Sequence, residues 1–151
     1  MTDRLDSDRA VSTTLGYVLT LSIVTLLVTG LLIAGGQYVG SQRERVVRSE
    51  LGVLSERLVS GIQSADRMAM AAGSSGEVVV VTKLPEKAGK TPYTVELVRD
   101  GGDTVLRLST SQPDVTVETV VNNRTAVSLS TVSGGDVRIE YRGDRLEVSR
   151  D

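Results

Sequence analysis

The sequence predicts an α+β fold: one long N-terminal helix, first transmembrane and then amphipathic, packed on a small antiparallel β-sheet. Three observations lead to this prediction. No charged residue occurs from Ala10 through Gln42, an apolar stripe with helical spacing follows, and the apolar period changes from 3.6 to 2 after Gly76. A chain of 151 residues has room for one modest domain and an anchor.

The uncharged stretch predicts a membrane-spanning helix over residues 11–42. Its apolar part, Leu15 to Val39, reaches roughly 37 Å as a helix, which exceeds a hydrocarbon core of roughly 30 Å. Tyr17 and Tyr38 would then lie near the two interfaces, as in an aromatic belt. The alternative is a buried core helix, but the rest of the chain is too short to wrap one of this length.

Small residues recur four positions apart within the predicted span. Such pairs let two helix backbones approach closely. The alternative is a membrane helix that merely tolerates Gly and Thr. The candidate helix-packing residues are Gly16 and Thr20, Gly30 and Ala34, and Gly36 and Gly40.

Residues 43–76 read as an amphipathic helix and a linker. Apolar residues spaced by three and four form one stripe, while polar residues such as Arg48 and Glu56 lie off it. Gly73 is well placed to cap the C-terminus of the helix, so we expect the helix to end at Ala72. The stripe consists of Val47, Leu51, Leu54, Leu58, Ile62, Ala65, Ala69 and Ala72.

Residues 77–151 alternate apolar and polar side chains between turn signals such as Asp100-Gly101-Gly102-Asp103. This pattern predicts an antiparallel meander of six or seven short strands. A β domain of this size buries too little surface to be robust alone. We therefore expect its apolar face to pack on the stripe of the preceding helix.

Composition argues against several classes of function. The chain has no Cys and no His, which removes thiolate chemistry, histidine metal ligation and the usual general base. It has no Phe or Trp and a net charge of −2, which disfavours nucleic-acid binding. No nucleophile–base spacing or metal-ligand spacing stands out. We expect a protein that is not an enzyme, with no catalytic residues, no cofactor and no metal.

The N-terminal residues carry a family resemblance. The segment Arg9-Ala10-Val11-Ser12-Thr13-Thr14-Leu15-Gly16-Tyr17, in which a charged segment and a small residue precede a hydrophobic helix, resembles the class III signal peptide of archaeal type IV pilin-like proteins. The resemblance implies a cytoplasmic leader over residues 1–10. It also implies that a prepilin peptidase cleaves between Ala10 and Val11, so that Arg9, Ala10 and Val11 form the processing site.

The same resemblance implies a function. The chain would be a pilin-like structural subunit in the cell membrane, with an extracytoplasmic β domain and the capacity to join a surface filament or pseudopilus. Its partners would be the membrane, the prepilin peptidase, and other pilin-like subunits or further copies of itself. The alternative is an unprocessed single-pass surface protein whose β domain binds a partner. Charge leaves the orientation open, because Arg4 and Arg9 precede the span while Arg43, Arg45 and Arg48 follow it.

One modification signal lies in the β domain. Asn123-Arg124-Thr125 is an N-glycosylation sequon in a predicted turn, which makes Asn123 a candidate glycosylation site. Occupancy would require this domain to lie outside the cell.

Overall fold

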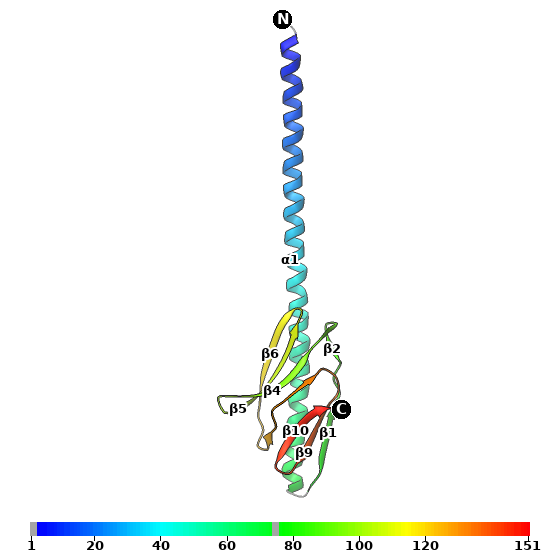
Figure 1. The fold of residues 1–151 in the computed structure, drawn as a ribbon, viewed down its shortest axis with the longest axis vertical. Helices are drawn as coiled ribbons and strands as arrows, with labels where there is room; N and C mark the ends of the chain where they lie inside the picture. Colours follow the sequence, from blue (N-terminus) through cyan, green and yellow to red (C-terminus); the bar gives the residue numbers. More distant parts are fainter. Residues whose placement is uncertain (1–2, 74–75) are drawn as a thin grey trace. The chain divides into compact units, whose positions relative to one another are not determined.

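A computed structural model describes residues 3–73 and 76–151, with side chains from residue 14 onward in these ranges. The described residues form one helix, α1 (Asp3–Ala72), followed by ten strands (Figure 1). The chain divides into two units, Met1–Gln42 and Arg43–Asp151. Helix α1 supplies the described part of the first unit and enters the second.

The end of α1 agrees with the sequence. The helix ends at Ala72, and Gly73 has a φ of +67°, the left-handed conformation that closes many helices and that glycine adopts without strain. The adjacent glycines Gly35 and Gly36, each less favourable in a helix than alanine by about 1 kcal/mol, do not interrupt the helix.

The apolar stripe of α1 is the helix's contribution to the core of the second unit. Seven of the eight predicted positions are buried, from Val47 through Ala69. Ala72 is the exception: it is exposed, because it lies in the last turn before the chain leaves the helix. Two polar residues, Ser55 and Asp66, are buried with the stripe.

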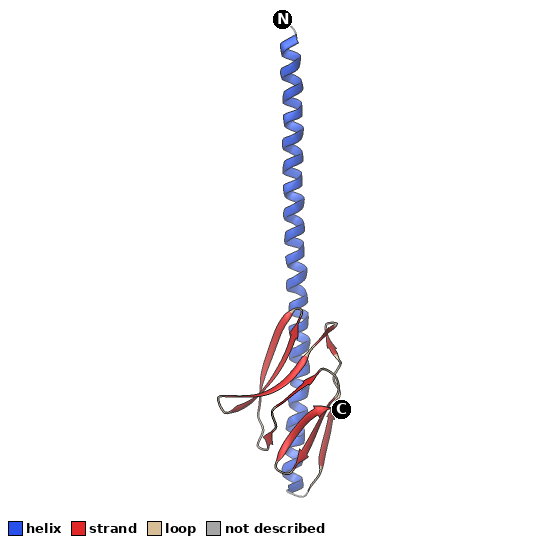
Figure 2. Ribbon diagram, viewed as in Figure 1, coloured by secondary structure: helices blue, strands red, loops and turns tan. Residues whose placement is uncertain are grey.

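The strands form two four-stranded sheets and a short hairpin (Figure 2). The first sheet has the order β1 (Val78–Thr82), β9 (Val137–Arg142), β10 (Arg145–Arg150), β7 (Ala126–Val127). The second has the order β6 (Asp114–Val121), β5 (Asp103–Ser111), β4 (Thr94–Asp100), β8 (Ser130–Ser133). The hairpin pairs β2 (Lys87–Ala88) with β3 (Thr91–Pro92).

This topology differs from a single meander. Consecutive antiparallel pairing holds for β4, β5 and β6, and for β9 and β10. In contrast, β1 pairs with β9 near the other end of the domain, and β7 runs parallel to β10. Local alternation shows which residues face inward, but it contains no information about which distant strands pair.

The α+β fold class is confirmed. The core combines the helix stripe with the inward residues of both sheets, among them Leu97, Leu106, Ile139 and Leu146. Figure 2 shows the strands packed along the C-terminal part of α1.

The helix and the first sheet approach closely at Gly61. A Cβ atom at this position would lie 2.2 Å from Thr82 Oγ1, so only glycine fits without a local shift. The hairpin is held in a different way. Gly89 and Lys90 have φ values of 55° and 75°, as a tight hairpin turn requires, and the Gly89 N–H donates to Glu50 Oε2 on the helix.

Candidate functional site

The apolar segment of α1 is the first candidate functional surface. Every side chain from Thr14 to Val46 is exposed, including large ones such as Leu26 and Leu31, each 73% exposed. Among the residues that the structure describes, α1 is the one helix long and apolar enough to cross a membrane. Its length and composition are compatible with single-pass membrane anchoring.

Hydroxyl groups in this segment are satisfied by the helix itself. Thr20, Ser22, Thr25 and Thr29 each donate to the carbonyl oxygen four residues earlier, at 2.8 Å. A polar group in hydrocarbon is costly unless it is hydrogen-bonded. These side chains can therefore face lipid or an apolar neighbour without a further partner.

The candidate helix-packing residues fall on two faces of the helix. At roughly 100° per residue, Gly16, Thr20, Gly30 and Ala34 lie within an arc of about 80°. The remaining pair, Gly36 and Gly40, lies on the opposite side, together with Thr25 and Thr29. A Cβ atom at any of the four glycines would meet nothing within 4 Å, so both faces are open to a neighbouring backbone. Their role in packing stays a prediction.

The processing residues Arg9, Ala10 and Val11 lie within the bounds of α1, but their side chains are outside those that the structure describes. Cleavage between Ala10 and Val11 therefore also stays a prediction.

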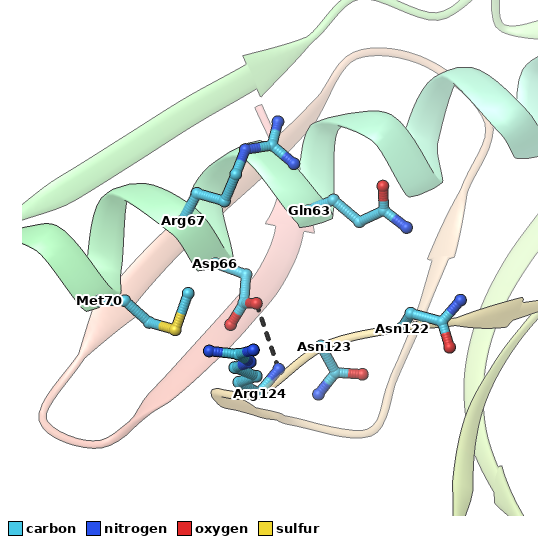
Figure 3. Close-up of a pocket in the computed structure, with 7 residues that line it drawn as sticks. All are labelled: Gln63, Asp66, Arg67, Met70, Asn122, Asn123 and Arg124. Carbon is cyan, nitrogen blue, oxygen red and sulfur yellow. Dashed lines mark hydrogen bonds between the residues drawn. The ribbon is translucent and has the colours of Figure 1, made fainter.

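The sequon belongs to a second candidate site, an open pocket of about 480 Å³ beside α1 (Figure 3). The loop between β6 and β7 carries Asn123, whose Nδ2 donates to the Thr125 carbonyl oxygen at 2.7 Å. Asn123 is half-buried. The pocket is lined by Gln63, Asp66, Arg67, Met70, Asn122, Asn123 and Arg124.

Asp66 holds the sequon loop against the helix. Its Oδ1 accepts the Thr125 N–H at 2.7 Å, and its Oδ2 accepts the Arg124 N–H at 3.1 Å. Burial raises the pKa of Asp66, but the hydrogen bonds from Thr125 and Arg124 and the Arg124 charge outweigh it, so that this pKa lies below the usual aspartate value. The carboxylate is charged at neutral pH, and both of its oxygens are occupied.

Sequence reasoning did not identify Asp66. A signal was present, because an acidic residue follows Ala65 directly and lies four positions after Ile62, at the border of the apolar stripe. A carboxylate at such a border needs a partner, but the sequence does not indicate that the partner is a loop 58 residues away.

This site is suited to holding a loop. A carboxylate whose oxygens both accept backbone N–H groups is a poor general base. Within residues 14–73 and 76–151, whose side chains the structure describes, no group of three or more His, Cys, Asp or Glu lies close enough to hold a metal ion. The absence of enzymatic activity, cofactor and metal remains a prediction.

Comparison with known proteins adds a family. The model of a family of unknown function, DUF7266, matches residues 6–150. No curated protein and no solved structure matches the chain.

Proposed function

The chain belongs to the family of unknown function DUF7266, and we propose that it is a pilin-like structural subunit inserted in the cell membrane through residues 11–42. The observation that carries this proposal is the unbroken run of exposed side chains from Leu15 to Val39, mostly apolar and none of them charged, on a helix that continues into the β domain. Exposed apolar area of this extent is unstable in water. It requires either lipid or other apolar helices around it.

A subunit that moves from a membrane into a filament needs a helix that is stable both in lipid and in contact with other helices. The self-bonded hydroxyls of Thr20, Thr25 and Thr29 suit lipid and a dry helix bundle equally. The open small-residue faces at Gly16 and Gly30, and at Gly36 and Gly40, would let neighbouring helices approach from two sides. Two such faces favour a bundle of several helices over a simple pair.

The resemblance of Arg9-Ala10-Val11 and the following helix to archaeal class III signal peptides supports the rest of the proposal. A prepilin peptidase would remove residues 1–10 on the cytoplasmic side and leave the hydrophobic helix on the mature chain. The β domain would then lie outside the cell, where the sequon at Asn123 could be glycosylated.

Self-association of the helix can be tested by cysteine cross-linking, because the chain has no native Cys. Gly30→Cys and Ala34→Cys place the thiol on one small-residue face, whereas Val28→Cys at a similar depth places it to the side of both faces. Each variant is oxidised in native membranes. The proposal predicts disulfide-linked dimers for the first two variants and far less for Val28→Cys.

The companion variant Gly30→Leu in the Ala34→Cys chain should block the close approach and abolish the cross-link. Equal, low cross-linking at all three positions would instead support an unprocessed single-pass anchor whose β domain binds a partner.

A further inference from the structure

Strand β1 (Val78–Thr82) is an open edge of the first sheet. It pairs with β9 on one side, and no other described strand pairs with it. Its sequence, Val-Val-Val-Val-Thr, contains no charge and no proline. Edge strands in soluble domains usually carry such residues, because an unguarded edge offers free N–H and C=O groups to another strand.

The outer face of β1 is apolar as well. Val79 and Val81 are 39% and 40% exposed, whereas Val78 and Thr82 are buried on the inner face. Their neighbours on β9 are Glu140 and Arg138, which are hydrogen-bonded to each other. The charges beside β1 are therefore already paired, and the two valines form a partly exposed apolar strip at the edge.

The residues that flank β1 are oppositely charged. Glu77 precedes the strand and Lys83 follows it, and both are exposed. Glu77 has no ion pair with any described residue, and Lys83 has one long contact, with its Nζ 3.9 Å from Asp136 Oδ2. By the alternation of a strand, Glu77, Val79, Val81 and Lys83 all lie on the outer face.

These features make β1 complementary to its own copy. When two β1 strands pair antiparallel with Val80 opposite Val80, all five strand residues find a partner. This register also sets Val79 opposite Val81, and Glu77 opposite Lys83 at both ends. The register with the fullest backbone pairing is thus the one that matches the flanking charges and joins the valines.

We propose that β1 is an interaction surface for a second copy of this chain, formed by antiparallel pairing of the two edges about Val80. Such a contact is isologous and closes at two copies. This contact differs from the packing of the N-terminal helices, because it is made by residues of the β domain. Since it closes at two copies, it cannot by itself extend a filament. Because β1 runs back along the C-terminal part of α1 (Figure 1), this pairing sets these parts of the two helices in opposite directions, so it would join two copies other than those packed side by side in one membrane.

Cysteine cross-linking tests the register. Full-length Val79→Cys and Val81→Cys chains, with tags of different mass, are purified in detergent, oxidised alone, and oxidised after mixing. The proposal predicts a heterodimer in the mixture and little homodimer from either variant alone, because residue 79 faces 81 and lies diagonal to its own copy. Homodimers as abundant as the heterodimer, or no cross-link in any sample, would overturn it.

Charge exchange provides the matched control. Lys83→Glu places two carboxylates opposite each other at both ends of the pair, so the heterodimer should be lost. The double variant Glu77→Lys with Lys83→Glu reverses both pairs and should restore it. No loss in the single variant, or no recovery in the double variant, would contradict direct pairing of these strands.

Gly30→Leu separates this contact from the proposed function. In the background of the mixed cysteine variants, this helix substitution should leave the β1 heterodimer unchanged. Loss of the heterodimer in Gly30→Leu would mean that the two chains meet through their helices and would overturn the β1 interface.

Discussion

Buried polar residues define how α1 meets the strands of its own unit. Ser55 Oγ and Thr119 Oγ1, which lies on β6, are 2.6 Å apart, and Asp66 accepts two N–H groups from the sequon loop. A buried polar group that loses its partner costs about 1–3 kcal/mol, so a shift of the helix along the sheet would be penalised at both points. The apolar stripe alone is less selective, because the hydrophobic effect is non-directional.

Gly61 provides the sharpest test of the close approach between α1 and β1. Gly61→Ala should lower the free energy of unfolding by about 1–3 kcal/mol, because the new Cβ would overlap Thr82 Oγ1. Gly52→Ala is the matched control, since a Cβ there meets nothing within 4 Å and alanine favours the helix by up to about 1 kcal/mol. Chemical denaturation of the full-length variants in detergent measures both. Equal effects at the two positions would contradict the packing.

Asp66 should make stability depend on pH. Its pKa in the folded protein lies below its ordinary value, so it contributes stability at pH values above the unfolded pKa, about 3.9. This contribution is lost as the pH falls through the lowered folded pKa. In Asp66→Asn, one of the N–H groups of Arg124 and Thr125 faces an amide nitrogen instead of a carboxylate oxygen. This substitution should lower the free energy of unfolding by about 1–3 kcal/mol at neutral pH.

The measurement is denaturation of the wild type and Asp66→Asn from pH 7 to acid pH, with the exposed Glu56→Gln as control. The difference in the free energy of unfolding between wild type and Asp66→Asn should become smaller toward acid pH. The free energy of unfolding of Glu56→Gln should follow that of the wild type. A difference that does not change with pH would rule out the carboxylate as its source.

At the scale of elements, the sequence predicts the features that are set by residues close together in the chain. The helix end at Ala72 follows from the glycine after it, and the buried face from Val47 to Ala69 and the inward residues of β4 follow from periods of 3.6 and 2. The pairing of β1 with β9 and the parallel contact of β7 with β10 could not be predicted. They depend on residues far apart in the chain, and any valine-rich strand satisfies the same alternation.

The candidate sites divide in the same way. The exposed apolar segment and the sequon at Asn123 are visible in the sequence because each is contiguous. The contact between Asp66 and the backbone of Arg124 and Thr125 is not, because it joins a helix to a distant loop.

Tyr93 tests the connection between the hairpin and the second sheet. It is buried, and its hydroxyl donates to the Pro85 carbonyl oxygen at 2.8 Å. Burial raises the pKa of Tyr93, so the hydroxyl keeps its proton. Tyr93→Phe should lower the free energy of unfolding by about 1–3 kcal/mol, because the Pro85 carbonyl oxygen would lose its hydrogen-bond donor.

The control for this prediction is Tyr141→Phe, since Tyr141 is half-buried and its hydroxyl makes no hydrogen bond to the described residues. Thermal unfolding of the full chain measures both variants. If Tyr141→Phe lowered the stability as much as Tyr93→Phe, the hydrogen bond to Pro85 would contribute nothing specific.

At the scale of the whole molecule, the two units face different requirements. The unit Arg43–Asp151 buries its own apolar stripe under two sheets, so this stripe is covered within the unit. The segment Leu15–Val39 has no such cover and depends on lipid or on other helices. A pilin-like subunit accounts for this division, because its β domain folds once while its helix exchanges one apolar environment for another.

The central claim is that the chain is a processed pilin-like subunit, and the intact mass of the chain from native membranes tests it most directly. The account predicts a mature chain that begins at Val11, and a full-length chain when Arg9→Ala and Ala10→Leu are introduced together. A native chain that keeps its first ten residues would contradict the account and leave an unprocessed membrane anchor in its place.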